Sequence, residues 1–278
     1  MAQATTSVEG QIDRIASEVL ARRSRNARRQ SAMLWLIRGV SLLIVIIAWQ
    51  IYGLHTLRIL FAPFTAVVQA GVDLFVNGPL GAAVLYSVST FLAGLVIGIL
   101  LGIAVGLVIG WSRKAEAAVG MYIYALYATP MVALVPLITL WFGFGLEAQL
   151  LIIVLFVFFP MVVTVYNGVL QVERSLLDVG RVFGASQLQV WRHIVLPGTV
   201  PYIMTGAQQA VAMGLVGMFI AEIFTALSGI GAVLETEANA YRTAPTLATV
   251  LVIMILGVVF RYLISVLHRR LAPWFVRS

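Results

Sequence analysis

The residues that could do chemistry gather in one polar stretch, Val172–Pro201, which interrupts the apolar second half of the chain. Its charged and ionisable side chains are Glu173, Arg174, Asp178, Arg181, Arg192 and His193. None of them pairs an acid or a nucleophile with a base at a spacing typical of a catalytic site. Polar, irregular backbone is not tolerated inside the hydrocarbon of a bilayer, so the stretch must lie in water on one side. It is therefore either a surface that contacts a partner or an ordinary solvated helix.

The composition is that of an integral membrane protein. The chain has 278 residues, of which 61% are hydrophobic and 10% are charged, and its mean hydropathy is +1.01. Soluble domains carry about 25% charged residues. The absence of cysteine excludes disulfides and thiolate metal sites. The three histidines, His55, His193 and His268, are scattered along the chain, so no metal site is expected.

Six apolar runs are long enough to cross a bilayer, which takes about 20 residues in a helix. They predict an all-α protein with spans near residues 33–54, 82–111, 119–141, 147–170, 198–227 and 244–267. Of the 18 lysines and arginines, 16 fall in the two ends and in the loops on one side, and only Arg58 and Arg242 fall on the other. By the positive-inside rule, this asymmetry predicts that both termini and the Val172–Pro201 stretch are cytoplasmic. The net charge of +7 is thus a topology signal, and it gives no support to nucleic-acid binding.

Residues 1–31 form a basic segment in front of the membrane domain, which we place at residues 32–278. Ile12, Ile15, Val19 and Leu20 recur at helical spacing, and a cluster of arginines follows them. The segment is either an amphipathic helix on the inner membrane surface or a disordered cytoplasmic tail that fixes orientation. Its long charged region and the lack of a small-residue cleavage site argue against a signal peptide.

Five glycines recur at every fourth position of the second span: Gly94, Gly98, Gly102, Gly106 and Gly110. Such a smooth face lets neighbouring helices approach closely in lipid. The spacing predicts a helix-packing surface, for which static packing is favoured over a surface that slides during gating. The run lies inside an apolar span and lacks the lysine of a phosphate-binding loop, so it cannot hold ATP.

Two further features mark the interior of the spans and are candidates for a pathway or gate. Pro130 and Pro136 each remove a backbone donor and are expected to kink the third span, at whose outer end Trp141 would lie. Glu222 is the one acid inside an apolar run, where a carboxylate is costly and usually faces a bundle interior or a water-filled cavity. Glu222 could line or gate the pathway, or it could be a structural carboxylate bonded to a neighbouring span; the sequence leaves both open.

The spacing within the polar stretch resembles the EAA motif of ABC-importer permeases. That motif reads E-A-A, three residues, G, nine residues, I, one residue and L-P, and it is matched by Asp178, Val179, Gly180, Gly184, Ile194, Leu196 and Pro197. Asp178 keeps the charge of the glutamate, whereas Val179 and Gly180 replace two alanines. Glycine inside a helix costs roughly 1 kcal/mol relative to alanine. The resemblance implies a short cytoplasmic coupling helix, within residues 172–197, that sits in a groove of the ATPase subunit.

A second set of residues narrows the resemblance to the nitrate/sulfonate/taurine branch of these permeases. The branch pattern P-x-x-A-x-x-P-L, followed by W-F-G-x-G, is matched by Pro130, Ala133, Pro136, Leu137, Trp141, Phe142, Gly143 and Gly145. The pair Ala221-Glu222 also matches this branch. The resemblance covers roughly residues 60–275, and residues 1–31 lie outside it. It implies a six-span, type I importer-like transmembrane domain in the plasma (inner) membrane that moves a small anionic solute by alternating access.

The resemblance also implies partners for the chain. They are two ABC ATPase subunits, which would bind ATP and Mg, a second permease copy, as in a homodimer, and an extracytoplasmic solute-binding protein. The segment that couples to the ATPase would comprise Asp178, Val179, Gly180, Arg181, Gly184, Ala185 and Ile194. Leu196 and Pro197 would set the angle at which the fifth span enters the membrane.

Two alternative functions stay open. One is an ABC importer of another cargo, such as a thiamine-precursor pyrimidine, an aromatic acid or bicarbonate, because the binding protein largely selects the solute. The other is a channel or secondary carrier that needs no ATPase, for which the spans offer no polar path apart from Glu222. An intramembrane enzyme is disfavoured, because no acid or nucleophile is paired with a base.

Overall fold

The computed structural model describes residues 33–225 and 228–271, with side chains up to residue 266. The predicted basic segment, residues 1–31, lies outside this part of the chain. The chain divides into two compact units, Met1–Thr65 and Ala66–Ser278. Throughout the described residues the backbone is helical or in turns, without a strand, which confirms the all-α prediction.

The first unit contains one membrane-length helix, Met33–His55. Nearly all of its apolar side chains are exposed, as expected of a helix that faces lipid or other subunits. The chain turns back after this helix, where Trp49 Nε1 donates a hydrogen bond to the carbonyl of Ala62 at 3.0 Å. Gly53 permits the turn, since a Cβ atom there would lie 2.5 Å from the Cα atom of Pro63.

The second unit is a helical bundle with short connections. Its α-helices are α2 (Phe64–Val76, which begins at the unit boundary), α3 (Leu80–Trp111), α4 (Arg113–Ala115), α5 (Met121–Ala128), α6 (Val135–Phe142), α7 (Leu146–Leu170), α8 (Arg174–Val182), α9 (Gln187–Val190), α10 (Leu196–Thr225), α11 (Ile230–Asn239) and α12 (Thr243–Leu271). π-Helical turns lie at Glu116–Gly120 and Trp191–Val195, and a 3-10 turn lies at Met131–Leu134. Within the described residues, five helices are long and apolar enough to cross a bilayer, or six if one bent pair is a single span. With the bent pair counted as one span, the number agrees with the six predicted spans.

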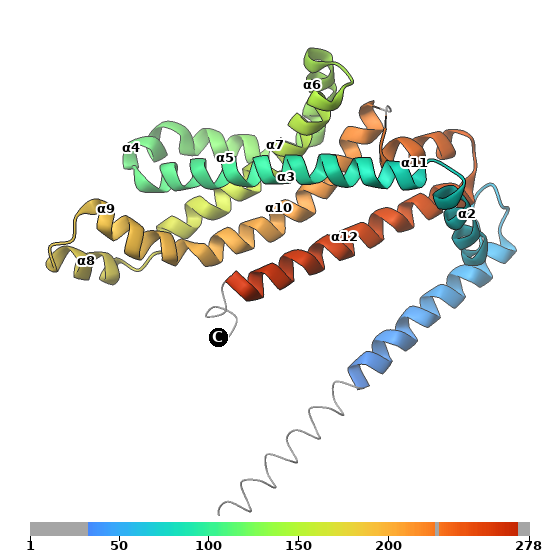
Figure 1. Cartoon of the computed structure of the whole chain (residues 1–278), viewed down its shortest axis with the longest axis horizontal. Helices are drawn as coiled ribbons and strands as arrows, with labels where there is room; N and C mark the ends of the chain where they lie inside the picture. The colour runs from blue at the N-terminus through green and yellow to red at the C-terminus, as the bar shows by residue number, and fades with distance from the viewer. Residues whose placement is uncertain (1–32, 226–227, 272–278) are drawn as a thin grey trace, which may run out of the picture. The chain divides into compact units, whose positions relative to one another are not determined.

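Helix α7 is the central helix of this unit and packs along both α3 and α10 (Figure 1). The core between the three helices includes Phe91 of α3, Val157 of α7 and Met218 of α10, all buried. Helix α12 adds Phe260, whose ring centroid lies 4.8 Å from that of Phe91. The apolar core is therefore built by helices far apart in the sequence.

The five glycines of the second span all lie against α7. A Cβ atom added at any of them would come within 2.9 Å of an α7 atom, closer than such contacts normally occur. Glycines of α10 approach α7 equally closely: a Cβ atom at Gly214 would lie 2.7 Å from Val157, and one at Gly217 would lie 2.8 Å from Phe156. Close approach maximises packing contacts, which drive helix association in lipid. The interfaces on α7 thus depend on residues without side chains.

The predicted third span, residues 119–141, is not one kinked helix. The segments Arg113–Ala128 and Met131–Phe142 meet at an angle of 91°. Thr129 and Pro130 have extended backbone, with ψ values of 134° and 100°, and Pro130 has no N–H with which to continue α5. Pro136 lies in the first turn of α6, where a missing N–H costs nothing, so it begins a helix rather than kinking one.

The helix that contains the predicted fifth span, residues 198–227, begins well before residue 198. The helix runs without a break from Gln187 to Thr225, over 39 residues, and includes the second half of the polar stretch. Pro197 follows the π-helical turn Trp191–Val195, and π turns accommodate a local change in the hydrogen-bond ladder. Leu196 and Pro197, which are predicted to set the angle at which the span enters the membrane, therefore lie inside a continuous helix.

Candidate functional site

The polar stretch folds into two helices joined by a tight turn at Gly184. Helix α8 ends in a Schellman motif, in which Ala185 N donates to the Gly180 carbonyl at 3.0 Å and Gly184 N donates to the Arg181 carbonyl at 2.9 Å. Gly184 has a φ of +73°, which glycine adopts without the penalty that a Cβ atom brings. The motif glycine is thus required by the backbone of the turn.

A capping box begins the second helix directly after this turn. Ser186 Oγ accepts from Gln189 N at 3.4 Å, and Gln189 Oε1 accepts from Ser186 N at 2.8 Å. The two bonds satisfy backbone donors that a helix N-terminus otherwise leaves free. The S-x-x-Q pattern could have predicted this helix start from sequence.

Gly180 and Ile194, two positions of the motif, contact each other across the turn. A Cβ atom at Gly180 would lie 3.1 Å from Ile194 Cδ1 and 3.3 Å from Val190 Cγ2. Gly180 is the one buried residue of α8. Because α8 packs on the following helix through these side chains, a small residue is needed at this position.

The rest of α8 presents an exposed surface. Asp178 and Arg181 form an ion pair at 3.4 Å, with side chains 69% and 73% exposed, so the pair contributes little to stability. Leu176, Val179 and Phe183 recur at spacings of three and four residues, which places them on one helical face. They are 50%, 52% and 86% exposed. An apolar stripe exposed on a polar segment is a candidate contact surface for another protein.

The stripe was missed by motif matching, although its periodicity in an otherwise polar segment was available in the sequence. Val182 of α8 and Leu188 of α9 are further exposed apolar side chains of this segment, at 85% and 68%. We name Leu176, Val179, Val182, Phe183 and Leu188 the coupling face. Gly180, Gly184 and Ile194 of the motif determine the geometry of the turn, and the coupling face is exposed on its surface.

An aromatic pair connects this segment to the end of α3. The rings of Trp111 and Trp191 are stacked, with centroids 4.5 Å apart and planes 25° apart. Close to the same end of the bundle, the Tyr166 hydroxyl of α7 donates to Glu116 Oε1 at 2.6 Å. The tryptophan pair ties the second helix of the coupling segment to α3, and the Tyr166–Glu116 bond ties α7 to the π-helical turn that follows α4.

Glu222 lies near the other end of α10 and is 1% exposed. Its Oε2 atom accepts a hydrogen bond from Gly231 N at 2.8 Å, in the first turn of α11. Ser87 Oγ accepts from Ile230 N at 2.9 Å, so two orphan donors of α11 are satisfied from other helices. The carboxylate also lies at the positive end of the α11 dipole. This geometry supports the structural alternative for Glu222.

Glycines allow this approach, since a Cβ atom at Gly231 would lie 2.7 Å from Glu222 Cβ, and Gly229 has a φ of +97°. A second polar link lies beside it. Tyr86 Oη donates to Gln149 Oε1 at 2.8 Å, and Gln149 Nε2 donates to Thr225 Oγ1 at 2.6 Å. Together these bonds join α3, α7, α10 and α11.

The broken third span packs next to this polar cluster. Val135 and Ile138 of α6 contact the buried Ala221, the neighbour of Glu222. Trp141, by contrast, is 67% exposed near the end of α6 and is not brought to Glu222 by these contacts. Within the described residues, no group of three or more His, Asp or Glu side chains could hold a metal ion.

Comparison with known proteins identifies the family. Residues 94–273 match the family of binding-protein-dependent transport system inner membrane components. The chain belongs to this family. It is therefore a multi-pass inner membrane permease of the ABC transporter class, which confirms the family and the membrane location inferred from the two motifs.

Curated relatives agree with this assignment. The chain is 31% identical over 213 residues to a protein named as an ABC transporter permease of Brucella abortus (strain 2308), covering 76% of this chain and 85% of that protein. It is 31% identical over 246 residues to a protein named as an aliphatic sulfonates transport permease, SsuC of Escherichia coli (strain K12), covering 86% and 93%. The taurine transport system permease protein TauC of the same strain is 28% identical over 242 residues, covering 85% and 88%.

Solved structures of ABC transporters share the fold. An amino acid ABC transporter crystallised with histidines has a TM-score of 0.58 at 17% identity, covering 76% of this chain and 99% of that chain. An inward-facing MetNI methionine transporter has a TM-score of 0.55 at 18% identity, covering 67% and 91%. At this identity the likeness is one of architecture.

Proposed function

We propose that the chain is the permease subunit of an ATP-driven importer for small organic sulfonates, with both termini and the coupling segment in the cytoplasm. The observation that carries the proposal is the turn at Gly184, which holds an exposed apolar coupling face on a motif-bearing segment. A separate ATPase would bind ATP and Mg, and its groove would cover this face. Two ATPase copies, a second permease copy and an extracytoplasmic binding protein would complete the assembly.

The coupling segment is built to pass on a displacement. Helix α8 is packed on the next helix through Gly180 and Ile194. That helix continues without a break to Thr225, so beyond the tight turn at Gly184 no further loop could absorb movement. At the far end, Glu222 and Thr225 bond to α11 and α7. Closing of an ATPase dimer would thus change the packing of α10 against its neighbours, as alternating access between two states requires.

The substrate class comes from the relatives. SsuC and TauC are named for aliphatic sulfonates and taurine, and each aligns with more than four fifths of this chain. A pyrimidine is the second candidate, because the formylaminopyrimidine permease ThiX of Halalkalibacterium halodurans is 27% identical over 164 residues. That alignment covers 59% of this chain, which makes the sulfonate assignment the better supported one.

The test is uptake into proteoliposomes that contain the full chain, with and without the ATPase and the binding protein encoded beside it. Taurine, ethanesulfonate, nitrate, a formylaminopyrimidine and benzoate would be compared. We expect ATP-dependent sulfonate uptake that requires all three proteins. If only the pyrimidine is taken up, the cargo is a pyrimidine and not a sulfonate. Uptake by this chain without the ATPase would contradict the importer function and favour a carrier or channel.

A further inference from the structure

A cavity of about 480 Å³ lies between the N-terminal part of α3 and helix α11. Its lining includes Pro79, Ala83, Tyr86, Ser228, Ala232 and Glu237. This volume falls in the range of ligand pockets, about 300–1,000 Å³. The walls are mostly apolar, and Glu237 is the one lining residue that carries a charge.

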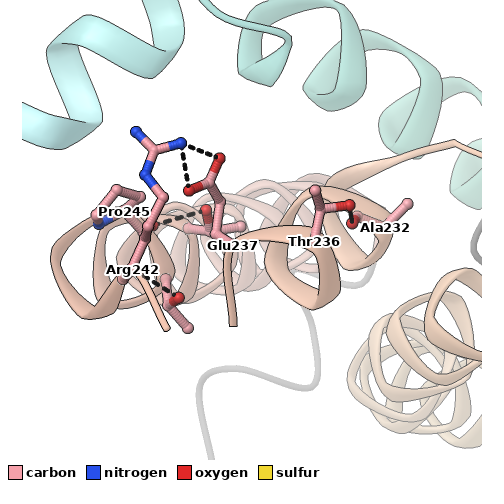
Figure 2. Close-up of polar contacts among 7 residues, drawn as sticks. Ala232, Thr236, Glu237, Arg242 and Pro245 are labelled. Carbon is pink, nitrogen blue, oxygen red and sulfur yellow. Dashed lines mark hydrogen bonds and ion pairs between the residues drawn. The ribbon is translucent and has the colours of Figure 1, made fainter. Parts of the chain in front are cut away.

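The carboxylate of Glu237 is fixed and buried, whereas its partner is not. Glu237 is 7% exposed as a residue. Arg242 Nη1 lies 3.0 Å from Glu237 Oε2 and 3.2 Å from Oε1, so both oxygens share a single nitrogen (Figure 2). The Arg242 side chain is 58% exposed, against 9% for that of Glu237. An exposed guanidinium can exchange into water at little cost, but the carboxylate cannot leave.

The chemistry of the cavity favours a cation over an anion. A carboxylate accepts about four hydrogen bonds, and one shared donor leaves most of that capacity free. Two backbone donors at the start of α11 are already used: Ile230 N bonds to Ser87, and Gly231 N bonds to Glu222. An anion entering alone would meet the Glu237 carboxylate with these two donors already occupied.

We propose that this cavity binds the ammonium end of a small zwitterion. The ammonium offers three donors to Glu237 in place of Arg242, and the released guanidinium pairs with the anionic end of the solute. The Glu237–Arg242 pair thus offers one carboxylate for the ammonium and one guanidinium for the anionic end of the same solute. With the proposed sulfonate function, on which this identification of the ligand rests, the solute is an aminosulfonate such as taurine. The preference for a cation does not depend on that function.

The absence of cysteine from the chain permits a direct test of the cavity. Ala232→Cys places a single thiol in its wall. The full chain, assembled with its ATPase in lipid nanodiscs, would be treated with 2-aminoethyl or 2-sulfonatoethyl methanethiosulfonate, which are similar in size and opposite in charge. In either case the thiolate attacks the reagent sulfur, a mixed disulfide forms and methanesulfinate leaves. Rates would be expressed relative to those with free cysteine.

We expect the cationic reagent to react at least about tenfold faster than the anionic one, because the Glu237 carboxylate lines the cavity while its partner Arg242 is largely exposed to water. Glu237→Gln should bring this ratio close to one. Glu235→Gln, a matched change on the same helix outside the cavity lining, should leave it unchanged. Arg242→Gln should raise the ratio, and this opposite shift separates a charge effect from misfolding. Equal rates for both reagents, or the same ratio after Glu237→Gln, would overturn the site.

Protection by solutes identifies the ligand. Taurine should slow modification of the Ala232→Cys thiol, whereas ethanesulfonate, which lacks only the amino group, should not. Protection by ethylamine but not by taurine would reject the zwitterion and retain an ammonium site, and protection by ethanesulfonate would reject the proposal. These readouts need no transport. Charge-selective labelling in a chain that takes up no sulfonate would contradict the proposed cargo alone.

Discussion

Three glycines show how single residues act here through what they lack. Gly180 leaves room for Ile194, Gly102 leaves room for Met161, and Gly184 supplies a left-handed backbone. The first two are steric requirements, and the third is conformational. These requirements predict different responses to the same change of glycine to alanine.

Gly102→Ala should destabilise the bundle, because its Cβ atom would lie 2.6 Å from Met161 Cβ. Overpacking of this kind costs typically about 1–3 kcal/mol. Gly257→Ala in α12 is the matched control, since the nearest atom of another helix to its added Cβ would be Leu215 Cδ1 at 3.9 Å. There the higher helix propensity of alanine should leave stability equal or slightly raised. Thermal unfolding in detergent measures both, and equal melting temperatures would contradict the packing role.

Gly184→Ala should weaken ATPase association, because a φ of +73° costs a residue with a Cβ atom about 1–2 kcal/mol. No atom lies within 4 Å of the added Cβ, so the penalty is one of backbone conformation. Gly184→Asn, which tolerates this conformation better despite its larger size, should retain more binding. Copurification of the ATPase compares the two, and a greater loss with asparagine would show that the limit is space. Gly184→Trp adds bulk as well and should abolish copurification.

At the level of elements, α11 is held at its first turn by groups of other helices. Glu222 accepts from Gly231, and Ser87 accepts from Ile230. Helix α11 has only 10 residues, too few for a stable isolated helix in water, so it depends on these contacts and on packing. A buried acid in a span acts here as an N-terminal cap for a neighbouring helix.

Glu222→Ala should therefore loosen α11, whereas Glu222→Gln, which keeps an acceptor oxygen, should have a smaller effect. Loss of a cap costs about 1 kcal/mol or more, which corresponds to several-fold faster local opening. Hydrogen exchange of the amides in residues 230–234 reports this opening. Glu147→Ala, at the start of α7, controls for loss of a carboxylate. Normal exchange in Glu222→Ala, combined with lost transport in Glu222→Gln, would support a pathway role instead.

The parts that the sequence could predict are those that depend on local spacing. Span number, the Gly184 turn and the close-packed glycine face follow from hydropathy, motif spacing and a four-residue period. The break at Thr129 could not be placed, because the apolar pattern continues through it and proline is compatible with a kink. The S-x-x-Q pattern marks the helix start at Gln187, but its unbroken continuation into the span was concealed, since α9 is polar and lies outside the apolar run. The partner of Glu222 requires knowledge of how α11 folds back onto α10.

On the scale of the whole molecule, the coupling face is the large apolar feature of the polar segment. Phe183 is 86% exposed at its tip. Burial of such a side chain contributes about 1.5–3 kcal/mol. In a complex of permease and ATPase, this residue would account for a substantial part of the contact.

Phe183→Ala should weaken ATPase binding by about tenfold or more while leaving the permease folded. Phe144→Ala is the matched control, because Phe144 is 58% exposed and precedes α7, outside the coupling segment. Titration of purified ATPase onto the permease in nanodiscs measures both affinities. Equal affinities for the two variants would show that the ATPase contacts another surface.

The helix from Gln187 to Thr225 has a mechanical consequence. At 1.5 Å per residue, 39 residues make a rod about 58 Å long, nearly twice the thickness of the hydrocarbon core. If such a rod pivots near its middle by about 10°, its two ends move about 5 Å in opposite directions. When the end near the coupling face moves toward its neighbours, the end near α11 moves away from its own. A pivot in the other direction reverses both movements. Opposite movement at the two membrane surfaces would then follow from the stiffness of a single lever.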